Sequence, residues 1–257
     1  MPFFDYNGKK IFYQLREKEK ERTIIFIHGS GENSHIWKTQ LNDLDLNYNL
    51  IAIDLPSHAE SGEFPELSLD LYVDVVKKLV DFLNLNKIIL CGHSLGGAIA
   101  LEYFFKNPKE VFALILCGTG SRLRVSPMIL NTLKNNYQEF LDSISMGFYR
   151  KTPRNIINDF IIQLSKTKPE VVYRDFEICD NFDVMDKVSS INVPCLIVCG
   201  NKDILTPIKY SQYFKDKIQN SKLVIIKNAG HMVMVEKPNE LNQAIQEFIE
   251  NYLIKFQ

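Results

Sequence analysis

The sequence predicts an α/β fold, with a mostly parallel, twisted sheet of about eight strands flanked by helices and a helical insertion after the sixth strand. Two observations favour this fold class. Apolar runs of strand length alternate along the 257 residues with longer segments whose apolar residues recur at helical spacing. The hydrophobic residues make up 46% of the chain, which is ample for a packed core.

The first two strands are expected in a hairpin over residues 2–17, with Asn7 and Gly8 as its tight turn. The other six strands follow from apolar runs bounded by turn residues, at 23–27, 50–54, 87–91, 111–117, 194–199 and 222–226. Between them, apolar stripes predict helices over 69–83, 98–105 and 239–253. These stripes are expected to pack on the sheet.

Residues 121–190 interrupt this alternation, because they are far more chain than one crossover helix needs. Apolar spacing predicts three helices within them, over 129–144, 156–164 and 171–178. We therefore expect a core of residues 1–120 and 191–257, with residues 121–190 as a separate helical unit.

The motif Gly-x-Ser-x-Gly occurs at Gly92, Ser94 and Gly96, directly after an apolar strand and before a predicted helix. This motif places its serine on a strand-to-helix turn so tight that the flanking positions must be nearly free of side chain. The pattern therefore predicts a nucleophile elbow at Ser94. Cys91, the other nucleophile nearby, is expected to lie buried within the strand.

A serine hydroxyl needs a neighbouring base, and the base needs an acid that fixes its tautomer. Asp203 and His231 each follow a predicted strand, in the order Ser, Asp, His. The carboxyl ends of parallel strands are where such sheets gather their chemistry. The alternatives are a turn role for Asp203 and a structural role for His231. Three other carboxylates lack a strand-end position: Asp180, Asp183 and Asp186.

Four ordered motifs resemble those of the α/β-hydrolase family, over about residues 20 to 250. They are His28-Gly29-Ser30-Gly31, the elbow at Ser94, the turn ending in Asp203, and the segment from Gly230 and His231 to Pro238. The resemblance implies a nucleophilic Ser94, a general base and acid in His231, and an orienting Asp203. It also implies an oxyanion hole made by the backbone N–H groups of Ser30 and Leu95.

The family resemblance further implies that residues 121–190 form a helical cap over an enclosed, mostly apolar pocket. One stretch departs from the family pattern D-x-P-G-H-G-x-S. Here Ser57 and Ala59 replace its two glycines, within Asp54-Leu-Pro-Ser57-His58-Ala59-Glu60-Ser61. The geometry of this loop is therefore left open by the sequence.

The resemblance implies a capped, esterase-like serine hydrolase that cleaves a small to medium carboxylic ester, or a thioester, through an acyl-enzyme. A nucleophilic aspartate, as in dehalogenase and epoxide-hydrolase relatives, is excluded by Ser94. Two alternatives stay open: a carbon–carbon bond hydrolase or perhydrolase on the same triad, and a triad-bearing sensor of a small ligand. Carbon–carbon bond hydrolases often carry Trp after the catalytic histidine, whereas Met232 follows His231 here.

The resemblance implies a small-molecule ester as the partner, and composition indicates neither nucleic acid nor a membrane span. A net charge of −1 gives no basic field for nucleic acid, and no apolar run is long enough to span a bilayer. We expect no signal peptide, cofactor or metal, and we make no prediction of oligomeric state. The histidines considered as metal ligands fit no compact ligand spacing: His28, His35, His58 and His93.

The cysteines indicate a reducing compartment. They number five, an odd number, and four fall in predicted buried strands: Cys91, Cys117, Cys195 and Cys199. Reduced thiols in the core favour a cytoplasmic location.

Overall fold

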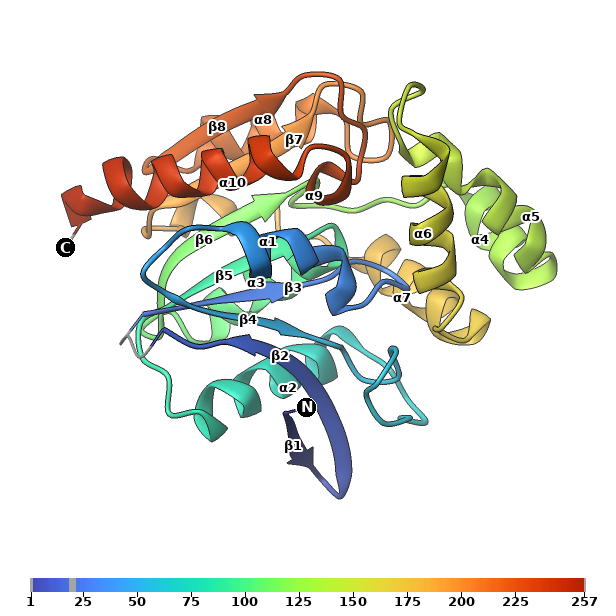
Figure 1. The fold of residues 1–257 in the computed structure, drawn as a ribbon, viewed down its shortest axis with the longest axis horizontal. Coiled ribbons are helices and arrows are strands. Elements are labelled where there is room, and N and C mark those ends of the chain that lie inside the picture. The colour runs from blue at the N-terminus through green and yellow to red at the C-terminus, as the bar shows by residue number, and fades with distance from the viewer. Residues whose placement is uncertain (1, 19–21, 257) are drawn as a thin grey trace.

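The computed structural model describes residues 2–18 and 22–256. Within these residues it has one eight-stranded sheet, in the order β1-β2-β4-β3-β5-β6-β7-β8. Strands β1 (Phe3–Tyr6) and β2 (Lys9–Arg16) pair antiparallel, and the strands from β4 to β8 run parallel. The predicted fold class, a mostly parallel sheet flanked by helices, is confirmed (Figure 1).

The parallel strands lie within two residues of the predicted ranges. They are β3 (Thr23–Ile27), β4 (Asn49–Ile53), β5 (Ile88–His93), β6 (Val111–Cys117), β7 (Cys195–Gly200) and β8 (Ser221–Ile226). The hairpin turn also agrees with the sequence, since Asn7 and Gly8 both have positive φ, at 52° and 80°.

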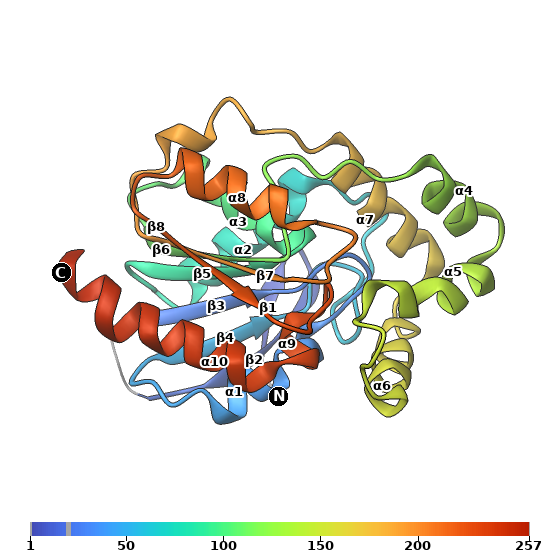
Figure 2. The ribbon, with the colours of Figure 1, turned by 90° about the horizontal axis from the view of Figure 1, so that it is seen from above.

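Helices cover both faces of the sheet, as Figure 2 shows from above. On one face lie α2 (Leu69–Phe82), α3 (Leu95–Lys106) and α8 (Ile208–Lys217), and on the other lie α1 (Lys38–Asp43), α9 (Val233–Glu236) and α10 (Pro238–Glu247). The central strands are buried on both sides. In β3, Ile25 and Ile27 join one hydrophobic cluster, whereas Ile24 and Phe26 join the other. Period-two alternation thus builds two cores from one strand.

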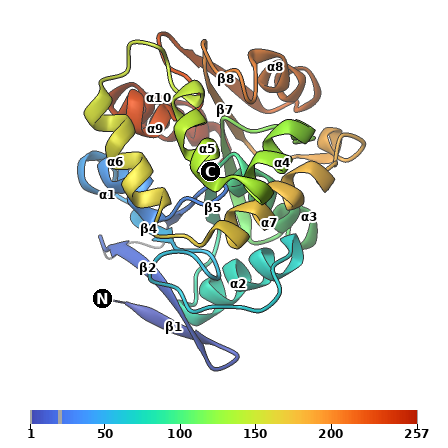
Figure 3. The same cartoon turned by 90° about the vertical axis from the view of Figure 1, so that its right-hand side faces the viewer.

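Four more helices lie between β6 and β7, at the end of the sheet to which the parallel strands point (Figures 1 and 3). They are α4 (Pro127–Asn135), α5 (Tyr137–Ser143), α6 (Arg154–Leu164) and α7 (Pro169–Asn181). Short 3₁₀ turns occur at Ser34–Trp37, Ile144–Gly147, Val188–Ser190 and Leu253–Phe256, and a π turn at Phe248–Tyr252. The helices of the described residues are too short or too polar to cross a membrane.

The prediction of a single helix over 129–144 is wrong. The chain breaks at Asn136, which has φ −152° and ψ 75° and ends α4. The Asn136 side chain then accepts the backbone N–H of Glu139 and begins α5 as its N-cap. The apolar spacing continues across the break, so the pattern alone does not reveal it.

Candidate active site

Ser94 lies on the turn between β5 and α3, with φ 51° and ψ −115°. This strained backbone is sustained by the two glycines of the motif. A Cβ on Gly92 would lie 2.1 Å from the carbonyl oxygen of Gly96, and a Cβ on Gly96 would lie 2.2 Å from that of Ile27. Any larger residue at either position would therefore displace backbone, which is why the elbow needs glycine.

His231 lies in the loop after β8, and its Nδ1 is 2.9 Å from Oδ2 of Asp203 in the loop after β7. The same carboxylate accepts the backbone N–H groups of Leu205 and Thr206 on Oδ1, at 2.9 and 2.8 Å. The Thr206 hydroxyl donates to Oδ2 at 2.7 Å and lies 3.2 Å from the His231 ring. Asp203 is thus held with one oxygen toward the histidine. Its partner Thr206 was not predicted from the sequence.

The electrostatics of this pair favour an imidazolium beside a carboxylate. Burial opposes charge on both groups, but the facing charge and the hydrogen bonds outweigh it. The pKa of Asp203 is lowered well below its usual range by His231 and Thr206. The pKa of His231 is raised, mainly by Asp203, with smaller contributions from Glu32 and Glu236. His231 therefore accepts a proton more readily than an isolated histidine would.

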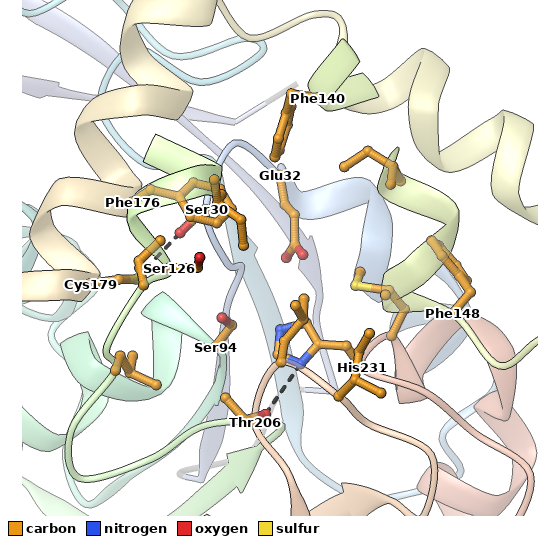
Figure 4. Close-up of a pocket in the computed structure, with 18 of the residues that line it drawn as sticks. Ser30, Glu32, Ser94, Ser126, Phe140, Phe148, Phe176, Cys179, Thr206 and His231 are labelled. Atoms are coloured by element: carbon orange, nitrogen blue, oxygen red, sulfur yellow. Dashed lines mark hydrogen bonds between the residues drawn. The ribbon is translucent and has the colours of Figure 1, made fainter. Parts of the chain in front are cut away.

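Ser94 and His231 line the same pocket, and in Figure 4 the second ring nitrogen of His231 faces Ser94. Because Nδ1 is engaged by Asp203, Nε2 is the ring nitrogen that remains on the side of Ser94. The structure thus brings together the three residues that the sequence predicted as nucleophile, base and acid.

Two backbone N–H groups beside Ser94 are open. Among the described residues, neither Ser30 nor Leu95 donates its N–H to another group. The amides on either side of Ser30 are occupied, since Gly29 donates to Glu32 at 2.6 Å and Gly31 donates to Asp175 at 2.8 Å. Leu95 is the first residue of α3, where the helix dipole favours negative charge. The two predicted oxyanion donors are therefore available to a ligand.

The pocket is a cavity of about 280 Å³ that the core and the helices after β6 line together. Apolar side chains from α5, α6 and α7 form much of its wall: Phe140, Phe160, Leu164 and Phe176. The core contributes polar groups at Ser30, Glu32, Ser94 and His231, of which Glu32 points into the cavity in Figure 4. An apolar cavity with a few converging polar groups is the usual form of a small-ligand site.

Residues 54–61 form the loop in which Ser57 and Ala59 replace the two family glycines. Both replacements nevertheless adopt the left-handed conformation that glycine favours. Ser57 and Ala59 both adopt positive φ, at 68° and 38°. The loop is held by the buried His58, whose Nε2 lies 2.8 Å from Oδ2 of Asp175 on α7. Tyr72 on α2 donates to the other oxygen of Asp175 at 2.6 Å. Asp175 thus connects α7 to this loop, to α2 and, through Gly31, to the loop that carries Ser30.

We expect Asp175→Asn to lower the free energy of unfolding by about 3–5 kcal/mol, because it removes the negative charge that faces the fully buried His58 and raises the pKa of that histidine against the effect of burial. Urea unfolding, followed by tryptophan fluorescence and circular dichroism, measures the change. The matched control is Asp159→Asn, whose ion pair with His35 is solvent-exposed and contributes little. Equal effects of the two substitutions would contradict the importance of the buried network.

Glu236 is a second residue that the sequence did not single out. Its carboxylate accepts the N–H of Gly230 at 2.9 Å and, from the loop after α5, the N–H of Tyr149 at 2.7 Å and the hydroxyl of Thr152 at 2.6 Å. The His231 N–H in turn donates to Gly147 at 2.7 Å. These contacts fix the His231 loop against the inserted helices. The position of Glu236 within the sequence motif that ends at Pro238 was the signal that could have identified this residue.

The residues considered as alternative acids and as an alternative nucleophile make other contacts or are buried. Asp180 accepts the N–H of Val125, and Asp183 pairs with Arg122. Cys91 is fully buried, and burial raises the pKa of its thiol, which disfavours the nucleophilic thiolate. In the described part of the chain, His, Cys, Asp and Glu side chains form no group of three suited to a metal ion.

Comparison with known proteins gives matches along most of the chain. The model of the alpha/beta hydrolase family matches residues 24–244. The AB hydrolase superfamily protein YisY of Bacillus subtilis (strain 168) is 26% identical over 245 residues, covering 88% of this chain and 91% of that protein. A pimeloyl-(acyl-carrier protein) methyl ester esterase of Neisseria meningitidis serogroup A is 22% identical, covering 90% of this chain and 78% of the esterase.

A solved structure of a thermophilic esterase is 35% identical to this chain. It superposes with a TM-score of 0.87, covering 98% of this chain and 97% of the esterase. Since the family model spans most of the residues and this structure matches nearly the whole fold, the chain belongs to the α/β-hydrolase family and is a hydrolase enzyme.

Proposed function

We propose that this enzyme is a serine hydrolase that cleaves a small to medium carboxylic ester through Ser94, His231 and Asp203. The observation that carries the proposal is the His231 ring, fixed by Asp203 on one side and facing Ser94 on the other. Esterases among the similar proteins support the same reaction class, the thermophilic esterase at 35% identity above all.

In the first half of the reaction, Ser94 Oγ attacks the ester carbonyl while Nε2 of His231 takes its proton. The carbonyl oxygen becomes an oxyanion, which accepts the N–H groups of Ser30 and Leu95. The lowered pKa of Asp203 keeps its carboxylate charged beside the imidazolium that forms. His231 then gives its proton to the leaving alcohol, which leaves an acyl group on Ser94.

Water completes the cycle. His231 Nε2 removes a proton from the water, the resulting hydroxide attacks the acyl carbonyl, and the proton passes to Ser94 as the acid departs. The same oxyanion donors serve this second tetrahedral intermediate. A thioester would follow the same steps with a thiol as leaving group.

We further propose that residues 121–190 act as the cap of this site. Their helices supply Phe140, Phe160 and Phe176 to the cavity wall, so a substrate would be enclosed between them and the core. A cavity of about 280 Å³ suits acyl groups of short to medium length. We also propose a reducing compartment such as the cytoplasm, because all five cysteines are free and buried.

A fluorophosphonate probe and a series of p-nitrophenyl esters test the proposal together. The probe needs only an activated serine and an oxyanion hole, so we expect one label per chain, on Ser94. We expect kcat/KM to peak at short to medium acyl chains and to fall once the chain exceeds the enclosed cavity. Mass spectrometry locates the label, and heat-denatured enzyme is the control.

Two other outcomes would count against ester hydrolysis through Ser94. Labelling of Ser94 without multiple turnovers on any ester or thioester would favour a ligand sensor over a hydrolase of esters. The absence of labelling would contradict the assignment of Ser94 as an activated nucleophile.

A further inference from the structure

Glu32 is an acidic residue in the mostly apolar wall of the pocket. Its side chain is 5% exposed and points into the cavity above His231 (Figure 4). Both of its hydrogen bonds are on Oε2, with the N–H of Gly29 at 2.6 Å and with His93 Nδ1 at 3.0 Å. Among the described residues, no group donates to Oε1. A buried carboxylate thus presents one unoccupied acceptor to whatever fills the pocket.

The contacts of His93 fix the orientation of this carboxylate. His93 Nε2 lies 3.2 Å from the carbonyl oxygen of His231, which can only accept a hydrogen bond. Nε2 is therefore the donor in this contact, and Nδ1 is the nitrogen that faces Oε2 of Glu32. Gly29 and His93 thus both hold Oε2, and among the described residues Oε1 is the oxygen left without a donor.

The Oε1 atom of Glu32 still needs a hydrogen-bond donor. Arg124 is a cationic residue that also lines the cavity. Its guanidinium donates to the carbonyl of Asp180 and forms no ion pair with Glu32. When a substrate displaces water from the pocket, Oε1 loses its remaining donors unless the substrate supplies one. Leaving a buried charged acceptor unpaired is costly.

We propose that Glu32 is a specificity-determining residue that selects esters carrying a hydrogen-bond donor, a hydroxyl or an ammonium group, a few bonds from the scissile carbonyl. This inference rests on the ester hydrolysis proposed above and narrows its substrate class. The donor replaces water at Oε1 when the pocket closes. An ester of the same shape without a donor leaves Oε1 unpaired and is a poorer substrate.

Three isosteric methyl esters test the proposal on the acyl side: butyrate, 3-hydroxypropionate and 3-aminopropionate. They place a methyl, a hydroxyl or an ammonium group at the same position. On the alcohol side, propyl acetate is compared with 2-hydroxyethyl acetate. We expect kcat/KM for a donor-bearing ester to exceed that of its apolar isostere roughly ten- to hundredfold, on the side of the ester that reaches Glu32. Acid release at constant pH measures the rates.

The variant Glu32→Gln separates this role from a structural one. Its amide oxygen can still accept from Gly29, while its NH₂ group takes the place of Oε1 and turns an acceptor into a donor. We expect the preference for ammonium over methyl to disappear, and the hydroxyl preference to survive in part because a hydroxyl also accepts. Glu32→Leu should lose both preferences. The ratio of two esters on one variant is independent of the amount of active enzyme.

Glu177→Gln is the matched control, since it removes a negative charge of α7 that pairs with Arg174 and does not line the cavity. It should leave every ratio as in the wild type, and fluorophosphonate labelling verifies that each variant has a formed site. Equal turnover of donor-bearing and apolar esters by the wild type, or ratios that Glu32→Gln does not change, would overturn the proposal while ester hydrolysis stood. If the wild type hydrolysed none of these esters or the p-nitrophenyl esters, the proposed function itself would fail.

Discussion

We expect Ser94→Ala to lower kcat for ester hydrolysis about 10⁶-fold, the scale found when a catalytic serine is removed from a triad. The loss follows from chemistry and not from unfolding. Alanine fits the elbow, because the steric demands of the turn fall on Gly92 and Gly96. KM should change little, because substrate binding depends on the cavity wall and not on the Ser94 hydroxyl. Steady-state kinetics on the best p-nitrophenyl ester measures both constants.

Circular dichroism and the urea midpoint of Ser94→Ala serve as controls, and both should match the wild type closely. The variant should also fail to react with the fluorophosphonate. Retention of more than a small fraction of the wild-type kcat, in a preparation free of wild-type enzyme, would mean that another residue is the nucleophile.

Asp203→Asn should lower kcat about 10⁴-fold near neutral pH, by analogy with the same substitution in a protease triad. The local hydrogen bonds give the reason. Oδ1 accepts two backbone N–H groups, so the oxygen of Asn would stay there and its NH₂ group would face His231. His231 would then carry its proton on Nε2, the nitrogen that must accept the serine proton.

The pH profile provides a second readout for Asp203→Asn. In the wild type, Asp203 raises the pKa of His231, so kcat/KM should fall with decreasing pH through a value above the ordinary histidine pKa. Without the carboxylate the imidazolium is less stable, so this acid limb should move to lower pH. A mild effect at position 203 with a severe one at Asp180 or Asp183 would show that another carboxylate serves the histidine.

The sequence was sufficient to predict the sheet, because strand formation depends on apolar residues that are neighbours in the chain. Strand β6 (Val111–Cys117), for example, is bounded as the run of apolar residues predicts. The helix break at Asn136 was missed for a related reason. Apolar spacing reports which face is buried, and this face continues from α4 into α5 although the backbone does not.

The Gly-x-Ser-x-Gly motif lies within five consecutive residues, so the sequence could also predict where Ser94 lies, although the space at Gly96 is limited by Ile27 of β3. The glycine requirement at Gly92 arises from Gly96, only four residues away. Asp203 and His231 are distant from Ser94 in sequence, and the residues alone left alternatives for both. The order of motifs along the chain favoured them, and the structure then placed Asp203 against the His231 ring.

The residues that the sequence did not reveal act through contacts between distant segments. Glu32 meets His93, 61 residues away, and Asp175 meets His58, 117 residues away. The sequence does not indicate whether a given carboxylate is solvated or buried. Only the fold decides which carboxylates lose water and which donors replace it, and burial makes those hydrogen bonds important for stability and specificity. The sequence by itself thus determined the sheet, the elbow and the order of the candidate catalytic residues, whereas tertiary packing decided the environment of each charge.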